Sequence, residues 1–341
     1  MQTIALSTGG IVTTRLGFGT AGLLREPSKR RRLDVLASAL DAGIRHFDTA
    51  PLYGLGESER LLGEFLAARS EPVTIATKFG LAPSAAAARL APVQALARAA
   101  LKAFPSLRGL ARRRASRLHE PPRFDAASAR TSLERSLAAL RRDRVDVFLL
   151  HECSPEAVTD ERLLEGLHEF RDRGRIRAFG TATTFDRTLA MVAARAGYCE
   201  TVQLDSDALS QNVRRLPCGA GTAVITHGAL ARAFAELRYM LRADAAACAR
   251  WTAALDADVG DPAVLARLLL QAALAANPRG VVIVQSTSPR HVAANAASAA
   301  SADPQQLARL ADLLRAYSRR HANGAELAGL RPSTHPSGAP L

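Results

Sequence analysis

Short apolar runs alternate with longer amphipathic stretches along most of the chain. The runs are rich in β-branched residues and bounded by turn residues, which predicts buried β-strands. We expect these strands at 15–19, 44–48, 73–77, 145–151, 175–181, 201–204, 223–226 and 280–284. Between them, apolar residues recur at helical spacing, as Leu133, Leu137 and Leu140 do. We expect helices at 28–42, 57–69, 126–142, 160–172, 185–196 and 262–276.

Eight strands joined mostly by helix-length segments predict an α/β fold with a parallel sheet, and eight such units close a (β/α)8 TIM barrel. The start of the chain, TIALSTGGIVTT, predicts an N-terminal β-hairpin that turns at Gly9 and Gly10. Two long insertions, 81–124 and 229–261, follow the third and seventh strands, so we expect both as active-site loops on the C-terminal face. We predict one domain over 1–320 and a disordered tail over 322–341.

The bulk composition narrows the class of protein. A length of 341 residues fits one barrel domain, and a hydrophobic fraction of 48% is enough for a large core. The four cysteines form no C-x-x-C pair, so we expect reduced thiols, no disulfide framework and no metal site. There is no signal-peptide pattern and no apolar run of about eighteen residues, so we expect a cytoplasmic protein without an integral membrane segment.

The positive charge of the chain is concentrated in one insertion. The formal net charge is +13, and the segment 102–123 holds seven basic residues and one acid, Glu120. Aromatic residues do not interleave with these arginines as they do in proteins that stack bases, so we expect no nucleic-acid partner. The segment is interpreted as a solvated helix over the barrel mouth, as a lid that attracts anionic substrates, or as a patch for an acidic partner or membrane surface.

A glycine motif near the start raises a competing interpretation. GFGTAG places Gly17, Gly19 and Gly22 in the G-x-G-x-x-G spacing of dinucleotide-binding Rossmann folds, with Asp48 at the end of the next strand. In that fold the helix begins inside the glycine loop. Here LLREP intervenes and the helix is expected to begin with Ser28 as its N-cap. We therefore interpret the motif as a tight loop at the barrel mouth.

Four polar residues follow or end the predicted strands on the catalytic face. Asp48, Lys78 and His151 lie at or just past the ends of strands two, three and four, and Tyr53 follows Asp48 by five residues. Each residue alone has an ordinary structural explanation. Lysine, however, occurs at only three positions in this arginine-rich chain.

Together these four residue types suit a proton transfer to a carbonyl oxygen. An ammonium beside a phenol stabilises the phenolate and lowers the pKa of the phenol, and a carboxylate keeps that ammonium charged. An imidazole on the next strand can orient the oxygen. No side chain supplies the hydride that such a reduction needs, so a nicotinamide is implied.

Four segments carry a family resemblance: GIRHFDTAPLYGLGESERLLGEFL, VTIATKFG, SLERSLAALRRDRVDVFLLHE and GRIRAFGTAT. They resemble the aldo-keto reductase superfamily, NAD(P)H-dependent barrel oxidoreductases, and the similarity runs from about Arg15 to Ala300. The resemblance implies that Asp48, Tyr53 and Lys78 form the catalytic tetrad with His151. It implies that Tyr53 protonates the carbonyl oxygen while hydride reaches the carbon.

The resemblance also implies the cofactor contacts. Gln203 matches the glutamine that holds the nicotinamide carboxamide, whereas TAT replaces the usual Ser-Asn at Thr183, and a stacking residue is replaced by His227. The full set of expected cofactor-binding residues is Gly19, Thr20, Thr183, Gln203, His227, Ser286, Arg290 and Asn295. The expected cofactor is NADPH/NADP+, with NADH as the alternative, because the basic residues that usually bind the 2′-phosphate are missing.

Two functions from different classes are open at this point. The first is an enzyme that acts on a small aldehyde, ketone or sugar lactol. LGFGTAGL and DTAPLYG resemble the aldose 1-dehydrogenase-like group of bacterial enzymes, which oxidise aldoses at the anomeric carbon. The second is a noncatalytic, nucleotide-binding regulatory protein on the same barrel.

Overall fold

The computed structural model describes residues 1–84, 121–194 and 196–327. Most of the insertion 81–124, including nearly all of the basic segment 102–123, lies outside the described residues. The same is true of residues 328–341. The proposals for the basic segment therefore stand as made from the sequence.

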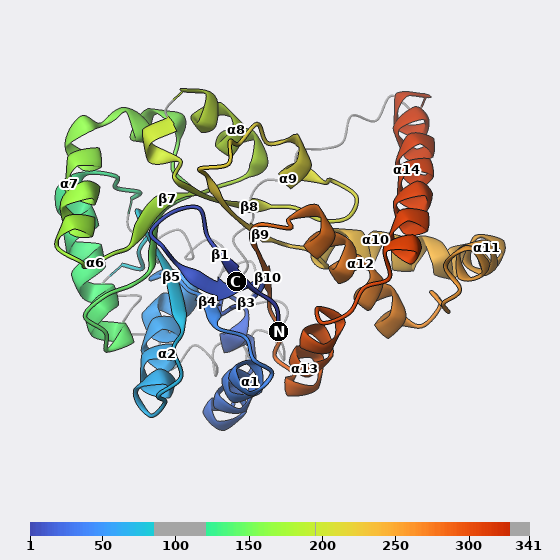
Figure 1. Ribbon diagram of the computed structural model, residues 1–341, viewed down its shortest axis with the longest axis horizontal. Helices are drawn as coiled ribbons and strands as arrows, with labels where there is room; N and C mark the ends of the chain where they lie inside the picture. Colours follow the sequence, from blue (N-terminus) through green and yellow to red (C-terminus); the bar gives the residue numbers. More distant parts are fainter. Residues whose placement is uncertain (85–120, 195, 328–341) are drawn as a thin grey trace, which may run out of the picture.

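Eight parallel strands close into a barrel in the order β10-β3-β4-β5-β6-β7-β8-β9, which confirms the predicted (β/α)8 TIM barrel (Figure 1). Each strand coincides with one of the eight apolar runs. The strands are β3 (Leu16–Gly19), β4 (His46–Asp48), β5 (Thr74–Phe79), β6 (Val147–His151), β7 (Ala178–Ala182), β8 (Thr201–Asp205), β9 (Ala223–His227) and β10 (Val281–Val284). The third strand is longer than expected, so Lys78 lies within β5 and not just beyond it.

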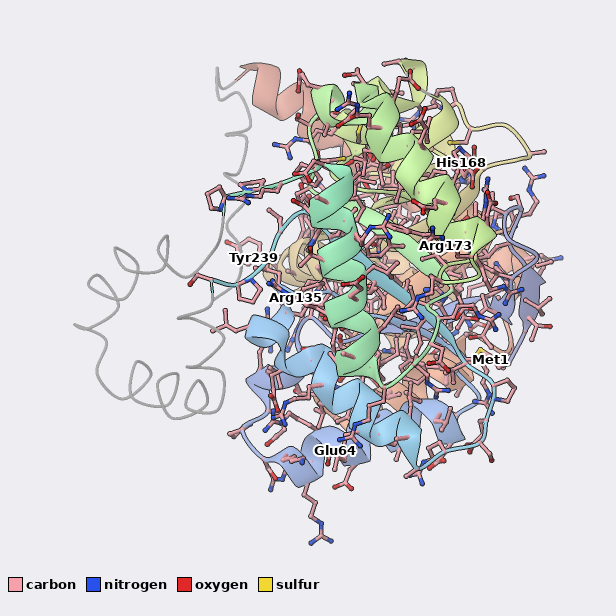
Figure 2. The ribbon with its side chains drawn as sticks, turned by 90° about the vertical axis from the view of Figure 1, so that its left-hand side faces the viewer. Met1, Glu64, Arg135, His168, Arg173 and Tyr239 are labelled. Atoms are coloured by element: carbon pink, nitrogen blue, oxygen red, sulfur yellow. The ribbon has the colours of Figure 1, made fainter. Side chains whose placement is uncertain are left out.

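The predicted helices surround this barrel. They are α1 (Lys29–Asp41), α2 (Glu57–Ala67), α6 (Ala126–Leu140), α7 (Glu161–Asp172), α8 (Phe185–Ala194) and α12 (Pro262–Ala276), followed by α13 (Pro289–Ser298) and α14 (Pro304–Leu327). Figure 2 shows α2, α6 and α7 packed in sequence along one side, with Arg135 and Arg173 on their solvent surface. Within the described residues, no helix combines the length and apolar character needed to cross a bilayer.

The first helix begins as expected, and its start excludes the Rossmann interpretation. Ser28 is the N-cap of α1, and its hydroxyl accepts from the backbone N–H of Arg31. The glycines of the motif serve close packing instead. A Cβ on Gly17 would lie 2.9 Å from the His46 ring, and one on Gly19 would lie 2.8 Å from Ile283.

Residues 229–261, expected as a loop, form two helices. These are α10 (Ala231–Ala243) and α11 (Ala245–Leu255), which pack with α12 and α14 beside the barrel (Figure 1). Leu237, Leu241 and Trp251 bury their side chains in that cluster, so burial of an amphipathic face accounts for the helices. The helix α14 also continues to Leu327, six residues into the segment 322–341 that was expected to be disordered.

The predicted hairpin closes the amino-terminal end of the barrel. β1 (Thr3–Ala5) pairs antiparallel with β2 (Val12–Thr14), and Leu6 and Ile11 between them are buried in the barrel's inner cluster. The Arg177 guanidinium donates to the carbonyl oxygens of Gly9 and Gly10 and fixes the turn. The hairpin therefore covers the end of the barrel opposite to the one where the strands terminate.

Candidate active site

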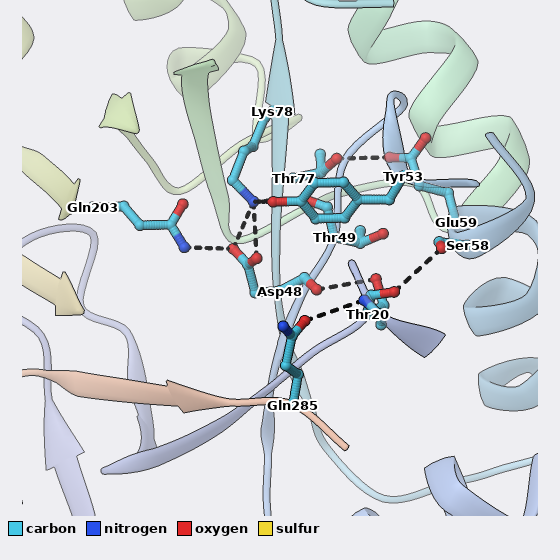
Figure 3. Close-up of polar contacts among 11 residues, drawn as sticks. Thr20, Asp48, Thr49, Tyr53, Ser58, Glu59, Thr77, Lys78, Gln203 and Gln285 are labelled. Atoms are coloured by element: carbon cyan, nitrogen blue, oxygen red, sulfur yellow. Dashed lines mark hydrogen bonds and ion pairs between the residues drawn. The ribbon is translucent and has the colours of Figure 1, made fainter. Parts of the chain in front are cut away.

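Lys78 is the centre of a compact polar cluster at the carboxyl end of the barrel (Figure 3). Its side chain is 2% exposed, and Nζ lies 2.9 and 2.8 Å from the two carboxylate oxygens of Asp48. Nζ also donates to the backbone oxygen of Thr49 at 2.9 Å and lies 3.1 Å from Tyr53 Oη. Burial lowers the pKa of Lys78, but Asp48 and Tyr53 outweigh that effect, so the pKa is raised and the ammonium stays charged.

The strand register brings these side chains together. β4 and β5 are neighbours, with Asp48 opposite Ala76, and Lys78 lies one inward-facing position further along β5. Because inward positions alternate along each strand, the carboxylate and the ammonium both enter the barrel interior. Because the ends of neighbouring strands converge as predicted, Asp48 and Lys78 come close enough to form an ion pair.

Tyr53 is presented by an unusual turn between β4 and α2. The turn η2 (Tyr53–Gly56) contains Gly54, Leu55 and Gly56 at φ angles of 58°, 57° and 90°. A Cβ on Gly54 would meet the Leu24 side chain, so that position also requires glycine for space. The backbone N–H of Tyr53 donates to Ala50 O at 3.0 Å, which completes the entry to the turn.

The pKa of Tyr53 is raised, contrary to the expectation that Lys78 makes the phenol acidic. Burial of the phenol is the largest cause of the rise, and the Lys78 ammonium opposes it without cancelling it. The expectation was incomplete because it counted the neighbouring charge and not the loss of hydration. At neutral pH Tyr53 is consequently in the protonated, proton-donating form.

His151, the last residue of β6, faces Tyr53. The two ring centroids are 5.8 Å apart and the rings are nearly perpendicular, at 87°. Burial, with Lys78 and His227 as lesser causes, lowers the pKa of His151 to about 3. Its imidazole is therefore neutral at physiological pH and can donate one N–H hydrogen bond without carrying charge. Nδ1 has no hydrogen-bond partner among the described residues.

Gln203 extends the cluster from β8. Its Nε2 donates to Asp48 Oδ1 at 2.8 Å, whereas its Oε1 is buried and has no partner within the described part of the chain. The carboxylate requires a donor, which fixes the amide with Oε1 facing away from Asp48. A buried acceptor without a partner suits a ligand that brings an amide or hydroxyl donor.

The remaining predicted residues lie along the same rim at strand ends. Gly19 ends β3, and the next residue, Thr20, is buried with its hydroxyl donating to Asp48 O at 3.1 Å. The Thr183 hydroxyl shares a 2.8 Å hydrogen bond with the Thr188 hydroxyl. His227 ends β9 with an exposed side chain.

Ser286, Arg290 and Asn295 lie beyond β10, around α13. Ser288 caps this helix, Ser286 Oγ accepts from the Ser288 N–H at 3.0 Å, and Arg290 is exposed in the first turn. The positive dipole end of a helix start and a nearby guanidinium favour an anion such as phosphate. The structure thus groups the predicted cofactor residues into two sets, one at the strand ends and one at α13.

Glu59, which was not predicted from the sequence, contacts β5 from the outer side of the barrel. Its carboxylate is buried, and Thr77, beside Lys78 in β5, donates to it at 2.6 Å. The signal was present in α2, because Glu59 shares a helix face with the buried Leu62 and Leu66. Its position on the apolar face of α2 therefore predicts that the Glu59 carboxyl is buried.

Comparisons with known proteins agree with this architecture. The profile of the Aldo/keto reductase family matches residues 15–315. An aldo-keto reductase from Bacillus halodurans has the same fold, with a TM-score of 0.68 at 18% identity over 92% of this chain and 96% of that one. An aldo-keto reductase from Klebsiella pneumoniae in complex with NADPH has a TM-score of 0.62 at 20% identity, over 92% and 96%.

The curated relatives are matched over part of their length. The chain is 30% identical to D-threo-aldose 1-dehydrogenase of a Pseudomonas species over 206 residues, 56% of each protein. It is 47% identical to pyridoxal 4-dehydrogenase of Microbacterium luteolum over 79 residues, 22% of this chain and 23% of that protein. The matched region thus spans just over half of the aldose dehydrogenase and about a quarter of the pyridoxal dehydrogenase. The family profile covers most of the chain, and the chain belongs to the aldo/keto reductase family.

Proposed function

We propose that this chain is an NAD(P)H-dependent oxidoreductase that acts on the carbonyl group of a small aldehyde or ketone, or on the anomeric carbon of a sugar lactol. The observation that carries the proposal is the Lys78 ammonium, 3.1 Å from the Tyr53 hydroxyl and held by both oxygens of Asp48. The names of the two curated relatives, an aldose dehydrogenase and a pyridoxal dehydrogenase, support this substrate class.

The residues present fit a nicotinamide dinucleotide. Gln203 Oε1, buried and without a partner in the described residues, can accept a hydrogen bond from a carboxamide. The segment around α13, with Ser286, Arg290 and Asn295, can hold the adenosine phosphate. We propose Gly19, Thr20, Thr183 and His227, at the ends of strands, as the remaining cofactor contacts. A bound nicotinamide supplies or accepts the hydride. We propose NADPH as the preferred form, with NADH as the alternative.

Each of the four clustered residues, Asp48, Tyr53, Lys78 and His151, has its own role in the proposed proton transfer. In reduction, the neutral His151 imidazole orients the carbonyl oxygen by donating an N–H, and Tyr53 gives that oxygen its proton. The phenolate left behind is stabilised by Lys78, whose charge is maintained by Asp48. Oxidation is the reverse: Tyr53 must first lose its proton to solvent, and the phenolate, stabilised by Lys78, then accepts the proton of the substrate hydroxyl while the hydride would pass to an oxidised nicotinamide.

The experiment is the Tyr53→Phe variant, assayed in both directions with a panel of aldehydes and aldoses and with both nucleotides. We expect turnover to fall by about 10² or more, since general acid catalysis typically contributes that much. The dissociation constant of NADPH, measured by its fluorescence, should change less than about threefold. Unchanged turnover in Tyr53→Phe would refute the assignment of Tyr53. Absence of turnover by the wild type across the panel would favour the noncatalytic regulatory protein.

The setting of the enzyme is also proposed from the sequence. We place it in the cytoplasm, with a small carbonyl or sugar substrate and no nucleic-acid partner. The basic segment 102–123 is proposed to contact an anionic substrate or partner.

A further inference from the structure

Glu59 is a buried acid that the proposed proton transfer does not use. It lies in the first turn of α2 and is 3% exposed. Burial of a carboxyl group is unfavourable unless hydrogen bonds replace its hydration. Burial raises the pKa of Glu59 to about 7, and hydrogen bonding to Thr77 and Ser136 and the charge of Lys78 oppose the rise. A group kept in so unfavourable a place calls for a structural or functional reason.

Its hydrogen bond joins the two segments that carry the reacting pair. The acceptor, Glu59 Oε1, is six residues after Tyr53, and the donor, Thr77 Oγ1, is 2.6 Å away in the residue preceding Lys78. Successive side chains of a strand point to opposite faces, so Thr77 faces α2 while Lys78 faces the barrel interior (Figure 3). One buried contact therefore links the phenol segment to the ammonium strand.

The turn that presents Tyr53 needs such an anchor. Leu55 is a non-glycine residue at a φ of 57°, a conformation that costs roughly 1–2 kcal/mol for an L-residue. The flanking glycines supply no side chains that could hold the turn in place. Ser58 also joins this segment to the barrel, but its Oγ donates to Thr20 O at a longer 3.4 Å. The hydrogen bond that Glu59 Oε1 accepts from Thr77 is shorter, at 2.6 Å.

We propose that Glu59 is a positioning residue: by accepting from Thr77 it fixes the Tyr53 turn against β5 and so sets the contact between Tyr53 Oη and Lys78 Nζ. The inference rests on the proposed function for its consequence in turnover, but its structural part does not. Glu59 forms no hydrogen bond with Tyr53 or Lys78, and it acts on Tyr53 through the backbone of η2 and α2.

Two pairs of variants test this role. Thr77→Val and Glu59→Leu remove the hydrogen bond with similar side-chain shapes. Thr77→Ser and Glu59→Gln retain a hydroxyl donor and a carbonyl acceptor, and Glu59→Gln also removes the charge. We expect the first pair to lower kcat by about tenfold or more, because small displacements of a reacting group are costly. The second pair should stay within about threefold of the wild type.

Two further readouts separate positioning from general damage. The dissociation constant of NADPH should remain within about twofold of the wild type in all four variants, since Glu59 lies behind β5. Crystal structures of Thr77→Val and Thr77→Ser should show the Tyr53 Oη to Lys78 Nζ distance lengthened in the first and kept near 3.1 Å in the second. This structural readout works whatever substrate the enzyme uses, and it does not depend on Glu59→Leu folding.

The outcomes are distinguishable. A Thr77→Val enzyme that keeps both the wild-type kcat and the wild-type distance overturns the inference. A loss of kcat in Glu59→Gln equal to that in Glu59→Leu also overturns it, because the charge and not the hydrogen bond would then matter. A wild type without turnover on any substrate overturns the proposed function, and the distance in Thr77→Val then decides the role of Glu59 alone.

Discussion

Two basic side chains lie in the same barrel interior, one charged and one neutral. Lys78 is surrounded by four oxygen atoms within 3.1 Å and stays charged. His46, two residues before Asp48 on β4, is fully buried, and neither ring nitrogen has a partner among the described residues. Burial lowers the pKa of His46 to about 4, so it is neutral. A buried cation persists only where the fold supplies the oxygens that replace water.

The number of oxygen neighbours separates the roles of the two residues: Lys78 belongs to the proposed catalytic site, whereas His46 serves packing. The imidazole of His46 fills space that a Cβ on Gly17 would occupy, since that atom would lie 2.9 Å from the ring. Lys78 is one of the largest buried side chains of the described chain, but its ammonium also sets the electrostatic field around Tyr53. Three changes test this contrast between a charged and a neutral buried group.

The largest effect is expected from Lys78→Met, which leaves the buried Asp48 carboxylate without its cation. Removing one partner of a buried ion pair costs about 3–5 kcal/mol of the free energy of unfolding. Turnover should fall by about 10³, because the phenolate loses its counter-charge. Urea unfolding and steady-state kinetics measure the two effects.

The matched control for this prediction is the double variant Lys78→Met with Asp48→Leu. Replacing both partners by apolar residues of similar volume should return most of the stability without returning turnover. A double variant as unstable as Lys78→Met would contradict the account of the uncompensated carboxylate.

A smaller effect is expected from acid on the two neutral histidines. An unfolded imidazole gains its proton near pH 6.5, whereas the folded His46 and His151 do so near pH 4 and pH 3. Between pH 6.5 and these lower values the unfolded state binds more protons than the folded state. The free energy of unfolding therefore falls as the pH falls from 6.5 toward 4. Glu59, with its pKa raised from 4.5 to about 7, works in the opposite direction.

The variant His46→Leu isolates one of these contributions. Between pH 7 and pH 5 it should lose about 2 kcal/mol less of its free energy of unfolding than the wild type loses. Urea titrations at the two pH values measure the difference. Equal losses in both proteins would mean that His46 is not the neutral, buried group described here.

The smallest effect is expected from the same substitution at the surface. Lys29 pairs with Glu64 at 2.7 Å, a distance close to that of Lys78 and Asp48, but its side chain is 51% exposed. Lys29→Met should change the free energy of unfolding by less than about 0.5 kcal/mol, because exposed ion pairs contribute little. A loss comparable to that of Lys78→Met would show that ion-pair distance and not burial governs these energies.

The fold was largely predictable because its signals are local. Each strand falls on a short apolar run of the sequence, and the parallel arrangement of those runs already predicts that Asp48, Lys78 and His151 converge at one end of the barrel. The helices α10 and α11 were not predicted because their apolar residues, Leu237 and Trp251 among them, are buried in a cluster that α12 and α14 complete. Part of that surface comes from α14, which is distant in sequence.

The energetics of the site were less predictable than its geometry. The raised pKa of Tyr53 follows from burial, which no local pattern reveals, so only the opposing effect of Lys78 was anticipated. The hydrogen bond from Thr77 to Glu59 joins residues 18 positions apart. Its significance depends on the left-handed turn that precedes α2, and the φ of Leu55 cannot be read from its residue type.

The hairpin at the foot of the barrel has a consequence for behaviour at high concentration. A closed barrel offers no free strand edge for pairing with another molecule, whereas the two-stranded sheet of β1 and β2 has one on each side. Val12, on β2, is 66% exposed and apolar. Within the described chain, therefore, strand-edge pairing between native molecules would involve the hairpin, and that edge could be blocked without touching the catalytic residues at the opposite end of the barrel.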